Sequence, residues 1–128
     1  MTATDHLQGA QFMPMADIMK LTSVDAEAEN DYRLDAGLAP RGTQVADILP
    51  HKLHEVETQR DRYAPMEHSM RTQGLTVPIA VNAGYLLNGG HRVAEAYRQG
   101  WVGMHVTDDF EGSTDRQWDA AHPRSTFG

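Results

Sequence analysis

The clearest alternation of apolar and polar residues lies in the second half of the chain. In 76–82 (TVPIAVN) every second residue from Val77 is apolar, which is the period of a half-buried strand. Ala83 and Gly84 follow as a turn, and 85–87 (YLL) predicts a partner strand. Because proline cannot donate to a strand ladder, Pro78 indicates an edge strand or the beginning of a strand. The segment therefore predicts a β-hairpin.

Two segments with helical spacing flank this hairpin. The first is predicted to begin at Pro65, whose missing N–H is harmless in a first turn, and to end at Gly74. It would bury Met66 and Met70, which lie four residues apart. The second is predicted over 91–99. Its inner face is expected to consist of Val93, Ala94, Ala96 and Tyr97.

Two further apolar runs complete the pattern. Residues 45–49 (VADIL) are followed by Pro50 and predict a short strand, and 102–106 (VGMHV) alternates and predicts a last strand. Residues 45–107 thus give the order strand, helix, hairpin, helix, strand. We expect an α+β fold with a small mixed β-sheet and packed helices.

The remaining segments are more polar. Residues 12–21 fit either a short helix or a strand followed by a turn, and 22–44 is rich in acids, Gly and Pro and predicts a solvated connector with at most one helical turn. We therefore expect an N-terminal extension and acidic connector over 1–44, a core domain over 45–110 and a C-terminal tail over 111–128, in which 116–121 is a candidate helix.

Composition narrows the classes of function. Eighteen acidic residues face eleven basic ones, for a formal net charge of −7, so a broad basic face for duplex DNA is disfavoured. Nine of the eleven basic residues are arginine, which suits bidentate contact with phosphate. The absence of cysteine excludes disulfides and thiol chemistry and suits a cytoplasmic location. No apolar run approaches the roughly 20 residues of a membrane span, so no membrane association is expected.

The strongest candidate site is the segment Asn88, Gly89, Gly90, His91 and Arg92, between a predicted strand and a predicted helix. Two glycines permit positive φ angles and a close approach to the backbone. The first amides of the helix and the positive end of its dipole then form an anion site. A histidine and an arginine would supply side-chain donors there. The segment therefore predicts a phosphate-binding turn.

Two motifs at the right separation resemble the ParB N-terminal/sulfiredoxin superfamily, also described as the ParB-like nuclease domain. The first is 74–81 (GLTVPIAV), and the second is 88–92 (NGGHR) continuing into 93–96 (VAEA). The resemblance covers about half of the chain. It implies the α+β fold predicted above and a nucleotide-binding role, with phosphates cradled by the glycine-containing turn.

Departures from the family pattern narrow what the resemblance implies. Sulfinic acid reductases have a cysteine before the His-Arg pair, where Gly90 stands here, so that activity is excluded. Partition proteins carry a helix-turn-helix domain and a dimerisation domain after the segment that corresponds to 88–92. Only 108–128 follow the last predicted strand here, so we do not expect a sliding clamp. Asn88 stands where the family often has an acidic residue, and Gly90 stands where it has His or Glu. These changes would reduce catalysis but keep the anion-binding turn.

The family's small-molecule kinases carry an acidic residue in a setting that 50–55 (PHKLHE) resembles. The resemblance makes Glu55 a candidate general base or an acid beside Mg²⁺. An exposed glutamate on a turn is the simpler interpretation. His51 and His54 lie three residues apart, but no third ligand is evident, so no metal site is predicted.

Three functions stay open, and the sequence leaves undecided whether the protein is an enzyme. The first is a stand-alone domain that binds a nucleoside di- or triphosphate with Mg²⁺, or another phosphate ligand, with NTPase or phosphotransfer chemistry. The second is a nuclease acting on DNA or RNA. The third is a non-enzymatic phage or mobile-element protein that binds a host protein, which the acidic connector favours.

Overall fold

The computed structural model describes residues 10–110 and residue 113, and its centre is a five-stranded mixed sheet. The strands are β1 (Gln11–Pro14), β2 (Thr22–Ser23), β3 (Ile79–Asn82), β4 (Tyr85–Asn88) and β5 (Gly103–Thr107). Their order across the sheet is β1-β5-β3-β4-β2. The β1–β5 and β3–β4 pairs are antiparallel, and the β3–β5 and β2–β4 pairs are parallel. The predicted α+β class with a small mixed sheet is confirmed.

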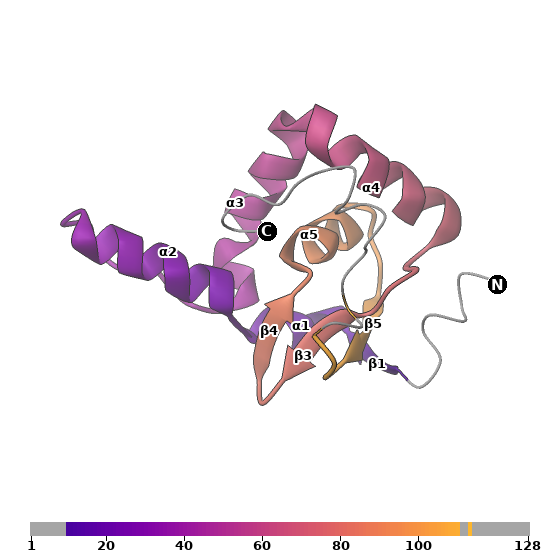
Figure 1. Ribbon diagram of the computed structural model, residues 1–128, viewed down its shortest axis with the longest axis horizontal. Helices are drawn as coiled ribbons and strands as arrows, with labels where there is room; N and C mark the ends of the chain where they lie inside the picture. Colours follow the sequence, from indigo (N-terminus) through magenta and orange to yellow (C-terminus); the bar gives the residue numbers. More distant parts are fainter. Residues whose placement is uncertain (1–9, 111–112, 114–128) are drawn as a thin grey trace.

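Within the described residues, five helices accompany the sheet: α1 (Met15–Lys20), α2 (Val24–Asp35), α3 (Val45–Thr58), α4 (Arg60–Gln73) and α5 (Gly90–Arg98). Figure 1 shows α5 between the sheet and the arch formed by α3 and α4, whereas α2 projects away from the body. The core lies around α5, where Val93, Ala94 and Ala96 are fully buried together with Ile79 and Val56. The first turn of α5 is consequently held by its neighbours on several sides.

The hairpin prediction is confirmed. Strands β3 and β4 pair directly, and Ala83 and Gly84 both have positive φ (51° and 82°), as the tightest hairpin turns require. Pro78 stands immediately before β3, so of the two predicted positions it takes the beginning of a strand. The last predicted strand is present as β5, with Met104 buried.

The predicted strand at 45–49 is wrong, because these residues form the first turns of α3. A capping box begins the helix: the Gln44 side chain accepts from the backbone of Asp47, and the Asp47 carboxylate accepts from the Gln44 backbone. Pro50 does not end the segment but lies inside the helix on its exposed side. The apolar residues of this run are buried at helical spacing, as Val45, Ile48 and Leu49.

The predicted connector at 22–44 is also wrong over much of its length, since α2 occupies 24–35 as a twelve-residue helix. Ser23 caps this helix by accepting from the backbone N–H of Ala26 at 3.2 Å. For 12–21 the structure combines the two alternatives, a strand (β1) followed directly by a short helix (α1). The sheet therefore crosses the domain boundary predicted at residue 44.

The helix expected from Pro65 begins five residues earlier, at Arg60, and includes Pro65. Its burial of Met66 and Met70 and its end at Gly74, with φ 73°, are confirmed. On α5 the prediction for Tyr97 is wrong, because this side chain is 49% exposed. The candidate helix at 116–121 lies outside the described residues. Within the described part of the chain, no helix has the length and apolarity needed to cross a bilayer.

Candidate functional site

The turn between β4 and α5 has the predicted backbone form. Gly89 is the residue that precedes the helix, with a left-handed φ of 112°, and Gly90 is the first helical residue. A Cβ at Gly89 would lie 2.5 Å from the Ile79 side chain, so only glycine fits. The first amides of an α-helix have no partner within the helix and carry the positive end of its dipole. The start of α5 is therefore suited to an anion.

Arg92, expected to face a phosphate, is directed at backbone carbonyls instead. Its guanidinium donates to the carbonyls of Val77 at 2.8 Å and Pro78 at 3.2 Å, and to that of Ser113 at 2.6 Å. The Asn88 amide donates to the Ser113 hydroxyl at 3.0 Å. These contacts join the entrance of β3, the start of α5 and residue 113, which is a positioning role for both side chains.

The cation beside the start of α5 is Lys52 of α3, which sequence reasoning missed. Its side chain is only 3% exposed, and its ammonium lies 2.9 Å from the Asp25 carboxylate of α2. A Cβ at Gly90 would lie 3.3 Å from Lys52 Cε and 3.4 Å from Asp25 Oδ2. An ion pair thus lies directly against the first residue of α5. Once α3 is seen as a helix, Lys52 falls on its buried face, three residues after Leu49.

Glu55, one turn further along α3, contacts two histidines. Its Oε1 lies 3.2 Å from Nε2 of His51 and 3.4 Å from Nε2 of His91. The His91 ring is stacked on Tyr63 of α4, with 4.6 Å between centroids, and its Nε2 is 3.0 Å from the Tyr63 hydroxyl. Because a carboxylate only accepts, the hydrogen bond to Glu55 requires that Nε2 carries the proton. Two of the predicted site residues, Glu55 and His91, are therefore in direct contact.

Burial and neighbouring charges together set the protonation states of Glu55, His91 and Tyr63. Desolvation lowers the pKa of His91 below 6.5 and outweighs the hydrogen bond and charge of Glu55, which act in the opposite direction. Burial alone would raise the pKa of Glu55, but the hydrogen bond from His91 and the charges of His91, Lys52 and His51 lower it below 4.5. The hydrogen bond from His91 and the Lys52 charge lower the pKa of Glu55 also when His91 is neutral. Burial also raises the pKa of Tyr63. At neutral pH the group is an ionised Glu55 beside a neutral histidine and a neutral phenol.

A cavity of about 250 Å³ lies between α2 and α3, next to these residues. It is lined by Asp25, Glu29, Tyr32, Ile48, His51, Lys52 and Glu55. Lys52 and Glu55 therefore both contribute to the lining of one cavity. His54 is exposed and does not line it. The described residues contain no group of three His, Cys, Asp or Glu side chains that could hold a metal ion.

No protein-family model matches the chain, and neither a curated protein nor a solved structure is significantly similar to it.

Proposed function

We propose that the protein binds a nucleotide, or another small phosphorylated ligand, in the cavity between α2 and α3, with a phosphate group beside Lys52 and the start of α5. One observation carries this proposal: Lys52 lines the cavity, and its buried side chain also lies against Gly90. A buried ammonium at the positive end of a helix is unfavourable unless anions offset it. Asp25 provides one anion, and an ammonium has two further donors for a phosphate.

The charges of the cavity favour a nucleotide that arrives with Mg²⁺. Asp25, Glu29 and Glu55 line it against one lysine and one histidine, so a bare di- or triphosphate would be repelled by three carboxylates. Mg²⁺ is commonly held by substrate phosphates together with one or two carboxylates. Such binding needs no preformed cage of three protein ligands. Asp25 pairs with Lys52, and the Lys52 charge lowers the pKa of Glu55, so these are the two carboxylates we expect beside Mg²⁺.

Glu55 is the residue we assign to chemistry at this site. It is ionised, it lines the cavity, and contacts from His51 and His91 fix its position. In phosphotransfer or nucleotide hydrolysis it would accept the proton of the attacking hydroxyl or water. His91, which is buried and stacked on Tyr63, holds it in place. Asn88 and Arg92 position the turn and are not assigned to the ligand.

A nucleotide-panel melting assay tests the proposal. ATP, ADP or CTP with Mg²⁺ should raise the Tm of the wild-type protein by several degrees, because a ligand at about 100 times its Kd adds about 2.7 kcal/mol of stability. Lys52→Met should lose the shift, and the double variant Asp25→Asn with Lys52→Met serves as a second test without an unpaired carboxylate. Lys20→Met, on the exposed part of α1, is the matched control and should keep it.

Two results would contradict the proposal: a Tm of the wild-type protein that no nucleotide changes, or a shift that the double variant keeps in full. A nuclease acting on DNA or RNA remains the alternative that uses the same turn. Plasmid and single-stranded DNA that stay intact with Mg²⁺ or Mn²⁺ would eliminate it.

A further inference from the structure

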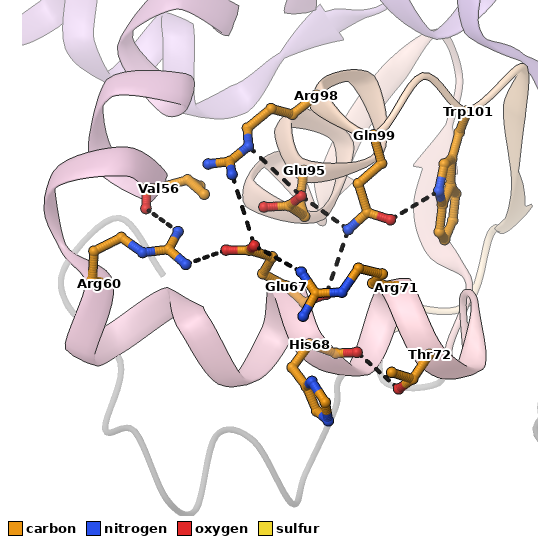
Figure 2. Close-up of polar contacts among 10 residues, drawn as sticks. All are labelled: Val56, Arg60, Glu67, His68, Arg71, Thr72, Glu95, Arg98, Gln99 and Trp101. Atoms are coloured by element: carbon orange, nitrogen blue, oxygen red, sulfur yellow. Dashed lines mark hydrogen bonds and ion pairs between the residues drawn. The ribbon is translucent and has the colours of Figure 1, made fainter.

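A second group of charged residues lies at the opposite end of α5, on the outer surface of α4 and α5 (Figure 2). Arg60, Arg71 and Arg98 all reach the carboxylate of Glu67. Arg71 Nη1 lies 3.1 Å and Arg98 Nη2 3.7 Å from Glu67 Oε1, and Arg60 pairs with Oε2. We call Arg60, Arg71 and Arg98 the arginine patch.

The arginine patch carries more positive charge than its neighbours offset. Glu67 is only 13% exposed, whereas the three arginines are between 34% and 58% exposed, so the guanidinium groups form the outer layer. Beneath them Glu95 is buried and accepts from Gln99 at 2.9 Å. Because Glu67 already orients the three side chains, a partner's anions would find them arranged with little further loss of side-chain entropy. The patch is therefore a prepared surface for a negatively charged partner.

The opposite charge is arranged on α2. Glu27, Asp31 and Asp35 are exposed and follow one another at four-residue spacing, so they share one face of the helix. We call these three residues the acidic stripe. Among the described residues none of the three has an ion-pair partner, whereas Asp25 and Glu29 of the same helix pair with Lys52 and Arg41. Like charges at this spacing repel, so cations from outside would stabilise α2.

The acidic stripe is also accessible to another molecule. Helix α2 projects from the body on the side away from α4, so the helix that carries the stripe is separated from α4 of its own chain (Figure 1). Tyr32 and Leu34, beside the stripe, are 69% and 57% exposed, and Tyr97, beside Arg98, is exposed as well. Each charged surface thus has an exposed apolar neighbour that a contact would cover.

We propose that the arginine patch of one copy of this chain binds the acidic stripe of a second copy. Three guanidinium groups meet three carboxylates, and the stripe extends about 12 Å along α2, within reach of side chains from two adjacent helices. A helix with exposed apolar residues fits the patch better than a nucleic acid, because Glu67, Glu95 and the net charge of −7 would repel a dense row of phosphates. The two surfaces differ, so the contact is head-to-tail and can continue to a third copy.

Sedimentation velocity over a concentration series tests this contact. The average mass of the wild-type protein should rise with concentration at about 0.1 M salt and fall back at about 0.5 M, where charges are more strongly screened. Asp31→Lys and Arg71→Glu should each weaken self-association by about tenfold or more. An equimolar mixture of the two variants should associate again, since the intact arginine patch of Asp31→Lys then meets the intact acidic stripe of Arg71→Glu. Asp17→Lys and Lys20→Glu, which change the charge equally on exposed positions of α1, should behave as the wild type.

Three outcomes would overturn the proposal. The first is a wild-type protein that stays monomeric up to about 1 mM, a concentration at which even weak contacts form. The second is a mixture of Asp31→Lys and Arg71→Glu that does not associate although both variants are folded by circular dichroism. The third is a monomeric wild type that binds single-stranded DNA in a manner lost in Arg71→Glu, which would assign the patch to nucleic acid.

Discussion

The two ends of α5 use charge in different ways. At its start, Lys52 and Glu55 are largely withdrawn from water, and each has one or two defined partners. At its other end, three exposed arginines share Glu67. Two unit charges 4 Å apart interact by about 1 kcal/mol in water and about 4 kcal/mol near a protein surface of lower effective dielectric. The buried end therefore fixes protonation states and geometry, while the exposed end contributes little to stability and is suited to recognition.

The largest effect expected at the buried end comes from the backbone of the turn. Gly89→Ala should lower the free energy of unfolding by about 3 kcal/mol, because the new Cβ would enter the Ile79 side chain while φ stays near 112°. Chemical denaturation measures this. Gly84→Ala is the matched control: its φ is also positive, but nothing lies within 4 Å of the added Cβ, so about 1 kcal/mol is expected. Equal losses in the two variants would contradict a close-packed turn.

The second-largest effect is expected for Arg92→Ala, and this variant tests whether Arg92 positions the turn or binds the ligand. Arg92→Ala removes donors to the carbonyls of Val77, Pro78 and Ser113 and should cost about 2 kcal/mol of stability. Calorimetric titration of the folded variant with the nucleotide found in the melting assay should give a Kd close to that of the wild type. A loss of nucleotide affinity with stability unchanged would instead show that Arg92, and not Lys52, meets the phosphate.

A smaller effect is expected in the dependence of stability on pH. Burial lowers the pKa of His91, so below pH 6.5 the unfolded chain binds a proton that the folded one does not. Stability contributed by neutral His91 is present above pH 6.5 and is lost as the pH falls toward its lowered folded value. His91→Asn should flatten this slope in urea unfolding series between pH 7 and 5. His54→Asn, at an exposed histidine of the same chain, should keep the wild-type slope.

The smallest effect belongs to the exposed end. Arg71→Ala should change the free energy of unfolding by about 0.5 kcal/mol or less, because exposed ion pairs are weakened by solvent and salt. The hydrogen bond from Arg60, together with the charges of Arg60, Arg98 and Arg71, lowers the pKa of Glu67. The Glu67 carboxylate therefore stays ionised through the neutral range. If thermal unfolding showed that Arg71→Ala loses more than about 2 kcal/mol of stability, the arginine patch would be required for the fold and not only for recognition.

Local signals in the sequence were sufficient for the hairpin and for the glycine turn. Gly84 in the hairpin turn and Gly89 before α5 have positive φ, a backbone conformation that favours glycine. Residues 45–49 misled the prediction, because a short apolar run before a proline has the same appearance in a strand and in the first turns of a helix. The capping box of Gln44 and Asp47, which distinguishes the two, uses glutamine in place of the usual serine or threonine.

The candidate site was predicted only in part, because its parts come from distant segments. Glu55 and His91 were each identified alone, but their contact depends on how α3 packs on α5. The place of Lys52 on the buried face follows once α3 is recognised as a helix, but its contacts with Asp25 and Gly90 depend on how α2, α3 and α5 meet. Arg92 belonged to the predicted motif, but its partners are backbone carbonyls. A pattern of side chains in the sequence does not predict such contacts.

The pairing of β1 with β5 has a consequence for how the chain acquires its structure during synthesis. Gln11 pairs with Val106, and Thr22 pairs with Tyr85. Both edge strands of the sheet therefore lie early in the sequence, and their partner strands lie much later. On the ribosome these early segments emerge long before their partners, and contacts that close such long loops form slowly. We therefore expect the nascent chain to remain without its complete sheet until nearly all of the described residues have left the exit tunnel, and only the β3–β4 hairpin to form earlier from neighbouring residues.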